Sequence, residues 1–446
     1  MICRSKISIM KNNHISLTAL AASTLLLVQA VSCTPAPTQK GERKTRHELF
    51  VKPEVTSIPY RIPAIATASN GDLIAVVDYR FSREDIGFGD NGRIDLHARI
   101  GKNNGKRWGE IFTLAEGRGG EATTVMEVGY GDPAIVADRE SDRVMVISCA
   151  GNVPYIQGTR NNHLLMTRFY SNDNGQTWSE PEDISEHIYA QFDHSTLGHA
   201  RSMFVASGRI MQSRTVKVGE YYRLYAAVLV TLENGDWRNF VLYSDDFGQR
   251  WGVLGGVNQT AINVRSDEAK VEELPDGRVL ISSRAQGGRN FNIFAYSDVA
   301  AAEGKWGELA FSGAENRGVE SKDNACNGEI MILPAEDIQT GEKVHLMLQS
   351  VPFGPDRWNV GIYFKALRSP ADYATAEDVA RNWERGYQAS TLESAYSTMC
   401  WLKNNRLGFL YEEGTYNAWE GGGYTIVYDS YSLEEITSDR FRYRKE

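Results

Sequence analysis

Short runs of apolar residues, each ended by a turn, recur along almost the whole chain. Clear examples are Leu73–Val77, Arg143–Ile147 and Arg278–Ile281. Pairs such as Asn70-Gly71 lie between the runs, and Asn, Asp and Gly are the residues that tight turns need. Runs of this length bounded by turn residues are typical of β-strands. Only residues 376–383 have helical character, so the pattern predicts an all-β fold.

A turn motif repeats at intervals of about 70 residues. Ser171–Trp178 reads SNDNGQTW, Ser244–Trp251 reads SDDFGQRW, and Gly101–Trp108 is a degraded copy, GKNNGKRW. Each copy follows an apolar run and combines an Asp or Asn that can bond nearby backbone, a Gly that accepts positive φ, and a Trp that covers the turn. A period near 70 residues gives five or six units, and we expect a six-bladed β-propeller.

The N-terminal segment differs from the rest of the chain. Arg4, Lys6 and Lys11 precede the apolar stretch Ile15–Val31, which is typical of a secretory signal peptide over residues 1–32. The stretch ends in Ala-Val-Ser before Cys33, which resembles a bacterial lipoprotein cleavage site. Ordinary cleavage after Ala30 is the alternative.

We expect a polar tether over residues 33–46 and one catalytic domain over residues 47–446. The protein should be exported by a bacterium, as an outer-membrane lipoprotein or as a periplasmic or secreted protein. The only membrane contact we expect is a lipid on Cys33.

Charge and cysteine content exclude several classes of function. The net charge of −9 argues against nucleic-acid binding. Any attraction for an anion must therefore be local to a site. Cys149, Cys326 and Cys400 are widely spaced and are expected to be buried free thiols. No residues have metal-ligand spacing, and no cofactor is expected.

The tetrapeptide Tyr60-Arg61-Ile62-Pro63 resembles the (Phe/Tyr)-Arg-Ile-Pro signature of sialidases, and the repeated turns resemble the Asp boxes of that family. Further motifs match the family in order, over roughly residues 47–435. The resemblance implies a six-bladed β-propeller exo-sialidase that acts on sialylated glycans. It also implies the residue roles that follow.

Three arginines would bind the carboxylate of sialic acid: Arg61, Arg284 and Arg357. Arginine suits this role because its planar guanidinium binds a carboxylate through two hydrogen bonds and stays charged. In Leu-Tyr-Glu at residues 410–412, Glu412 would orient Arg61. Glu413 is the competitor, and strand alternation allows only one of them to face the site.

Tyr396 resembles the family's nucleophile, with Glu268 as its base. A neutral phenol is not repelled by the substrate carboxylate, and sialidases with a tyrosine nucleophile are an exception to the usual pair of carboxylates. The phenol has an ordinary pKa near 10, so it needs an adjacent base. Glu268 lies in the segment Asp267–Val271, and Glu393 is a rival base close to Tyr396 in sequence.

The loop after Tyr79 supplies the general acid in the family. Asp85 is assigned this role, first as acid and then as base for water, and Arg80 would contact the sugar or hold Asp85. Asp132 would contact the amide side of the sugar, unless it only forms an Asp-Pro turn. The loop also offers Glu84, Asp90 and Asp95, and the strand-like context of Asp95 favours a structural role for it.

The aglycone side and the acceptor stay open. Trp358, Tyr363, Tyr416 and Trp419 are available for an apolar wall. The same catalytic residues would serve a trans-sialidase or an intramolecular variant that forms an anhydro sugar. A non-catalytic glycan-binding propeller is the alternative of another class, and loss of Tyr396 or Glu268 would mark it; both are present.

Overall fold

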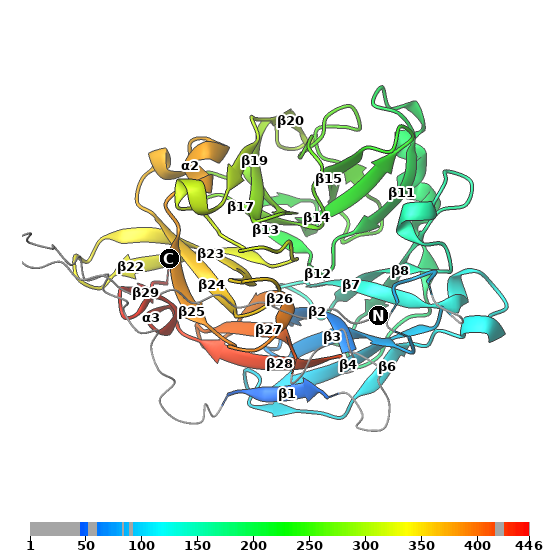
Figure 1. Ribbon diagram of the computed structural model, residues 1–446, viewed down its shortest axis with the longest axis horizontal. Coiled ribbons are helices and arrows are strands. Elements are labelled where there is room, and N and C mark those ends of the chain that lie inside the picture. Colours follow the sequence, from blue (N-terminus) through cyan, green and yellow to red (C-terminus); the bar gives the residue numbers. More distant parts are fainter. Residues whose placement is uncertain (1–44, 52–59, 83, 89–91, 415–422, 446) are drawn as a thin grey trace, which may run out of the picture. The chain divides into compact units, whose positions relative to one another are not determined.

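The computed structural model describes residues 45–51, 60–82, 84–88, 92–414 and 423–445, which belong to one compact unit spanning Lys44–Glu446. The predicted signal peptide and Cys33 lie outside the described residues. Figure 1 shows strands in almost every part of this unit. None of the described helices is long and apolar enough to cross a membrane.

The largest sheet joins the beginning of the unit to its end. Its strands are β1 (His47–Phe50), β2 (Tyr60–Thr67), β3 (Leu73–Arg80), β4 (Ile94–Lys102), β5 (Arg107–Trp108), β6 (Phe112–Ala115), β26 (Ser394–Trp401), β27 (Leu407–Gly414) and β28 (Tyr424–Tyr431). In Figure 1 the blue β1 and β2 lie beside the red β28. A single residue pair, Tyr60 with Tyr424, links β2 to β28, so this sheet consists of two antiparallel groups of strands.

Four five-stranded sheets follow along the chain. The first holds β7 (Tyr130–Ala137), β8 (Val144–Ala150), β9 (Leu165–Ser171), β10 (Glu182–Asp183) and β12 (Gly208–Arg209). The second holds β11 (Ala200–Val205), β13 (Met211–Val218), β14 (Tyr221–Leu232), β15 (Trp237–Ser244) and β16 (Gly252–Val253). The third holds β17 (Ala269–Glu273), β18 (Val279–Ala285), β19 (Gly288–Asp298), β20 (Glu303–Trp306) and β21 (Ala310–Ser312). The fourth holds β22 (Ile330–Asp337), β23 (Lys343–Pro352), β24 (Val360–Leu367), β25 (Glu384–Gln388) and β29 (Phe441–Tyr443).

Helices are few and short in the described residues. The α-helices are α1 (Ser185–Tyr189), α2 (Ala376–Ala380) and α3 (Leu433–Thr437). The 3-10 helices are η1 (Gly119–Glu121), η2 (Met126–Val128), η3 (Tyr155–Gln157), η4 (Ala190–His194), η5 (Ala314–Asn316) and η6 (Pro370–Tyr373). The all-β prediction is therefore confirmed. The helix expected at residues 376–383 is present as α2, but α1 and α3 were not expected because one helical turn leaves no apolar periodicity to detect.

The repeated turns form compact hairpin ends. The Asp173 carboxylate accepts the backbone N–H of Thr177 (2.9 Å) and the Thr177 hydroxyl (2.6 Å). Gly175 has φ of 86°, and the Trp178 indole donates to its carbonyl (3.0 Å). Residues 244–251 repeat the arrangement, with an arginine guanidinium bonding the aspartate in place of the threonine hydroxyl. These turns are structural, as the sequence predicts.

The apolar runs are buried on both faces because each sheet packs between two others. In β3, Ile74 and Val76 lie in one core cluster with Ile135 and Val146 of the next sheet. The opposite face of β3 packs against β27 and β28, with Val77 in that second cluster. A buried strand of this kind shows a continuous apolar run rather than alternation, which is the pattern of residues 73–77. Three cysteines, Cys149, Cys326 and Cys400, are buried free thiols as predicted.

Candidate active site

Three irregular strand starts present the candidate residues. The pairing of β2 is interrupted between Arg61 and Ala64, and that of β26 between Ser394 and Ser397, around Tyr396. A third interruption in β7 surrounds Asp132, whose φ is 53°. β-Bulges redirect side chains and are over-represented beside active sites. The irregularities therefore occur where the sequence predicts chemistry.

Glu412 holds the first of these strand starts in place. Ile62 has φ of 56°, a costly conformation for a β-branched residue. The Glu412 carboxylate accepts the Ile62 N–H (2.8 Å) and Arg61 Nε (2.7 Å) through one oxygen, and the Tyr396 N–H (2.9 Å) through the other. Glu413 points the opposite way and pairs with Arg46 (2.6 Å). Of the two glutamates, Glu412 is thus the partner of Arg61.

Tyr396 and Glu268 meet directly, although 128 residues separate them. The Tyr396 hydroxyl donates to Glu268 Oε1 and accepts a hydrogen bond from Arg284 Nη1 (2.9 Å). Burial raises the pKa of Tyr396 well above its ordinary value, and the Glu268 charge adds to this. Burial works against a charge on Glu268, but Arg284 and the phenol lower the pKa of this carboxyl to about 2. The pair is therefore a neutral phenol against a carboxylate.

The β17–β18 hairpin brings Arg284 back beside Glu268. The two strands pair antiparallel, and the Arg284 N–H donates to the Glu268 carbonyl (2.8 Å). Arg284 Nη1 then reaches Glu268 Oε2 (2.6 Å) and Asp267 Oδ2 (3.2 Å). Burial and the Glu268 charge raise the pKa of Asp267 to about 7. The hairpin thus returns Arg284 to the edge where Glu268 lies, as the strand-turn-strand pattern predicts.

Arg357 completes a group of three arginines around Tyr396. Its guanidinium carbon lies 5.8 Å from the centre of the Tyr396 ring, and that of Arg61 lies 5.5 Å from it. Burial lowers the pKa of Arg357, and the positive charges of Arg61 and Arg284 lower it further. The Cys326 thiol and the Tyr396 phenol act in the opposite direction, and the pKa of Arg357 is raised overall. Three arginines thus lie beside Tyr396: Arg284 bonds its hydroxyl, and Arg61 and Arg357 lie near its ring.

Arg80 lies between the two remaining candidates, Asp85 and Asp132. Its Nη1 donates to Asp85 Oδ1 (2.5 Å), and its Nη2 lies 3.8 Å from Asp132 Oδ1. The Asp85 side chain is 64% exposed, whereas that of Arg80 is buried. Arg80 is the main reason that the pKa of Asp85 is lowered, while burial, Asp78 and Asp85 raise the pKa of Asp132. The three predicted residues are thus in one cluster.

The rival residues lie elsewhere or have other partners. Asp95 pairs with Arg93 and accepts the Gly117 N–H (2.9 Å), which fits the structural role expected of it. Glu84 is exposed. Tyr396 hydrogen-bonds Glu268 rather than the rival base Glu393. Asp90, Tyr416 and Trp419 lie outside the described residues.

The proposed aromatic wall is only partly available. Trp358 is 44% exposed beside Arg357. Tyr363 is buried in a core cluster, and its hydroxyl accepts from Arg385 Nε (3.0 Å). Tyr363 therefore does not face the candidate site, because its ring packs in this cluster and its hydroxyl is bonded to Arg385.

Two carboxylates of the site were missed as candidates. Asp78 has no exposed surface and accepts hydrogen bonds from Arg80 and from the Asp132 N–H. Asp267 borders Arg284. A signal for Asp78 was present, since a carboxylate inside an apolar run and two residues before an arginine lies on the same face of a strand. A buried charge without a partner would be strongly unfavourable.

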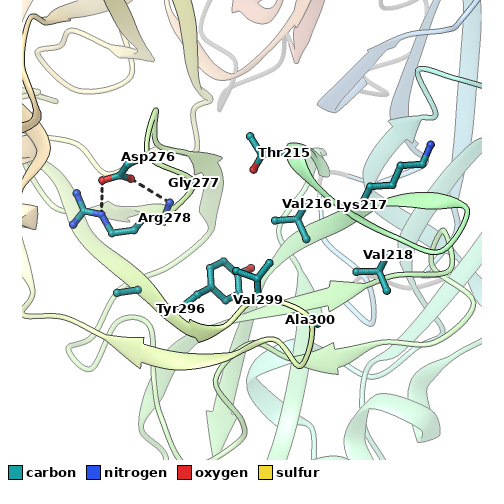
Figure 2. A pocket seen from close by; sticks show the side chains of 11 residues that line it. Thr215, Val216, Lys217, Val218, Asp276, Gly277, Arg278, Tyr296, Val299 and Ala300 are labelled. Carbon is teal, nitrogen blue, oxygen red and sulfur yellow. Dashed lines mark hydrogen bonds and ion pairs between the residues drawn. The ribbon is translucent and has the colours of Figure 1, made fainter.

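A cavity of about 700 Å³ lies away from these residues (Figure 2). It includes the β17–β18 turn at Asp276–Arg278, the opposite end of the hairpin from Glu268 and Arg284. Figure 2 shows Arg278 bonded to Asp276, and the arginine also donates to two backbone carbonyls. Its charge is therefore already compensated, and the cavity contains no comparable reactive group. Among the described residues, no cluster of His, Cys, Asp and Glu could hold a metal ion.

Comparison with known proteins finds sialidases among the similar proteins. A family model described as a BNR repeat-like domain matches residues 89–309. A sialidase of Micromonospora viridifaciens is 27% identical over 429 residues, covering 91% of this chain and 59% of that protein. The chain spans between 55% and 64% of the length of the curated relatives it matches, all of them sialidases.

Two solved structures share the fold. A Hadza microbial sialidase superposes with a TM-score of 0.63 at 21% identity, covering 85% of this chain and 66% of that one. An intramolecular trans-sialidase of Ruminococcus gnavus, bound to oseltamivir carboxylate, also gives a TM-score of 0.63, at 15% identity, covering 87% and 98%. Together with the sequence similarity over nine tenths of the chain, these findings show that the chain is similar to bacterial sialidases in sequence and shares its fold with solved sialidase structures.

Proposed function

We propose that the protein is an exo-α-sialidase that removes terminal sialic acids from glycoproteins, glycolipids and oligosaccharides. The observation that carries this proposal is the environment of Tyr396, whose hydroxyl donates to Glu268 and accepts from Arg284 while Arg61 and Arg357 lie near its ring. Sialylated glycans are the expected partners, and no cofactor or nucleic acid is part of the proposal. The sialidase relatives support it.

The fold proposed to carry this site is a six-bladed β-propeller. Its support is the sheet topology: four separate sheets, and a fifth that divides into β1 with β26–β28 and β2–β6. These six groups would each form one blade. The connection of the first group to the last would close the ring.

Substrate binding would depend on the arginines. Sialic acid bears a carboxylate on the carbon that reacts, and Arg61, Arg284 and Arg357 would bind it. A second carboxylate attacking that carbon would be repelled by the first, whereas a phenol would not. Glu268 would take the phenolic proton while the bond from Tyr396 oxygen to carbon forms, so that no free phenolate is needed.

Asp85 would complete the first step by protonating the leaving oxygen as its bond to the sugar breaks. In the free protein Arg80 favours the ionised form of Asp85. The carboxylate of a bound substrate adds a negative charge to the site, which raises the pKa of Asp85 toward the protonated form. In the second step, Asp85 would deprotonate a water that attacks the sugar carbon, the bond from this carbon to the Tyr396 oxygen would break, and Glu268 would return its proton to the phenolate. Two displacements retain the anomeric configuration.

Replacing the acid should affect substrates according to their leaving groups. Asp85→Asn cannot donate the proton, so kcat/KM for sialyl-lactose should fall about 10²–10⁴-fold. An aryl sialoside whose phenol leaves readily should lose much less. Initial rates on both substrates test this, with Glu84→Gln as the control, because Glu84 is an exposed neighbour in the same loop. Equal losses on both substrates would contradict the acid role.

The identity of the released sugar tests the proposed reaction. Incubation with a pair of sialyl-lactose isomers, followed by mass analysis, should yield free sialic acid. A product lighter by one water would instead indicate an anhydro sugar, such as the 2,7-anhydro-Neu5Ac in complex with a leech intramolecular trans-sialidase. Transfer to added lactose would indicate a trans-sialidase. Binding without any product would indicate a non-catalytic glycan-binding protein.

We also propose export and lipid attachment at Cys33. The apolar run ending in Ala-Val-Ser-Cys motivates this. Mass spectrometry of the protein isolated from bacterial membranes should find a diacylglyceryl-modified Cys33 as the mature N-terminus. An unmodified N-terminus at any other residue would contradict it. Cys33→Ser should release the protein from the membrane fraction.

A further inference from the structure

We propose that Asp78 is a positioning residue that fixes Arg80 and Asp132 and keeps the general acid Asp85 protonated during catalysis. This inference rests on the proposed function, in which Asp85 is the acid. Asp78 itself is expected to touch neither the substrate nor the reacting atoms.

The position of Asp78 is set by three elements. It lies on β3, opposite Arg61 of β2 in the strand pairing, and its side chain has no exposed surface. One carboxylate oxygen accepts Arg80 Nε (3.0 Å) and Nη2 (2.8 Å), and the other accepts the Asp132 N–H (2.9 Å). A single buried carboxylate therefore links β3 to the start of β7.

Both groups that Asp78 holds need support. Asp132 adopts φ of 53°, a conformation uncommon for residues other than glycine, and the hydrogen bond from its N–H to Asp78 stabilises it. Arg80 is buried, so its charge needs more than the exposed Asp85 as a partner. Without Asp78, neither the guanidinium nor the Asp132 side chain would be fixed against the sugar.

Asp78 also competes with Asp85 for the guanidinium of Arg80. Arg80 binds Asp78 and Asp85 at the same time, so each carboxylate weakens the hold of the arginine on the other. The other titratable and charged groups around Asp78 and Asp85 are Arg61 of β2, Asp132 of β7, Cys149 of β8 and Glu268 beside β17. When the charge of Asp78 is removed, Arg80 interacts more strongly with Asp85. The pKa of Asp85 should then fall.

The sign of the pH effect follows from these charges. Burial raises the pKa of Asp78, Arg80 lowers it, and the Asp85 charge raises it, with a result of about 6. Above that pH the wild-type residue is charged and keeps the pKa of Asp85 higher. The alkaline limb of the pH–activity profile of Asp78→Asn should therefore lie about one pH unit below that of the wild type. Below pH 6 the two profiles should converge.

The test compares wild type, Asp78→Asn and Asp95→Asn in the full chain, on sialyl-lactose and on an aryl sialoside. Asp95 is a matched control because it is also a buried aspartate paired with an arginine two residues away, on the adjacent strand β4. At neutral pH, Asp78→Asn should lose about tenfold more kcat/KM on sialyl-lactose than on the aryl sialoside. Asp95→Asn should leave the ratio and the alkaline limb unchanged.

Thermal unfolding separates this effect from loss of structure. If Asp78→Asn does not fold, Asp78→Ser, which has a smaller uncharged side chain that can still accept hydrogen bonds, is measured in its place. Equal losses on both sialosides with an unmoved alkaline limb would overturn the proposal, because Asp78 would then only stabilise the sheet. Turnover of neither sialoside by wild type would instead overturn the proposed function, and this inference with it.

Discussion

Tyr396→Phe should lower kcat on sialyl-lactose by about 10³-fold or more, while binding of a sialic-acid analogue stays within a few-fold of wild type. Residues that act as a unit with a nucleophile produce losses of this size when removed. Binding should persist because Arg61, Arg284 and Arg357 remain. The contacts of Arg61 and Arg357 with the Tyr396 ring do not need the hydroxyl. Steady-state rates and isothermal titration with the analogue measure the two effects.

A matched control for this variant is Tyr411→Phe. Tyr411 is buried on β27 in a core cluster, on the opposite face of the strand from Glu412. The same loss of a hydroxyl there should change kcat less than twofold. Full activity in Tyr396→Phe would contradict its role as nucleophile, and loss of analogue binding together with activity would indicate disruption of the site.

Arg284→Ala should lower kcat/KM by about 10²–10³-fold and weaken analogue binding as well. Truncating one partner of a buried, hydrogen-bonded charge pair carries a cost of this order. Arg284 serves both steps, since it would bind the substrate carboxylate and it donates to Glu268 and to the Tyr396 hydroxyl. The contact with substrate is present in ground and transition states, so KM should rise and kcat should fall.

Arg278→Ala is the control, because Arg278 lies at the far end of the same β17–β18 hairpin and pairs with Asp276. Its activity should stay within about twofold of wild type. A fall in kcat for Arg284→Ala with unchanged analogue binding would contradict carboxylate binding by Arg284. Equal effects of the two substitutions would indicate that activity depends on the integrity of the hairpin rather than on the side chain of Arg284.

Sequence alone predicted the elements and many of the contacts. Apolar runs such as Leu73–Val77 predicted strands because their burial on both sheet faces leaves a continuous apolar pattern. Alternation along β27 limits the partner of Arg61 to Glu412 or Glu413, and the hydrogen bonds of Ile62 and Tyr396 identify Glu412. Glu268 and Tyr396 were paired by their motifs across 128 residues of sequence, and they meet as a hydrogen-bonded pair.

Other features depend on tertiary structure and could not be predicted. Positive φ at Ile62 and Asp132 arises where the strand pairing is interrupted, and nothing in the local residue types indicates it. The role of Asp78 depends on a backbone N–H from another sheet. Tyr363 is available for the aglycone wall by sequence, and only its packing in a core cluster shows that it is buried.

The most direct test of the proposed mechanism is a proton NMR time course of sialyl-lactose hydrolysis by the wild-type protein. Double displacement through Tyr396 predicts that free sialic acid appears first as the α-anomer and then converts to the β-anomer by mutarotation. Initial appearance of the β-anomer would contradict the retaining mechanism. The absence of any released sialic acid would contradict the proposed hydrolysis.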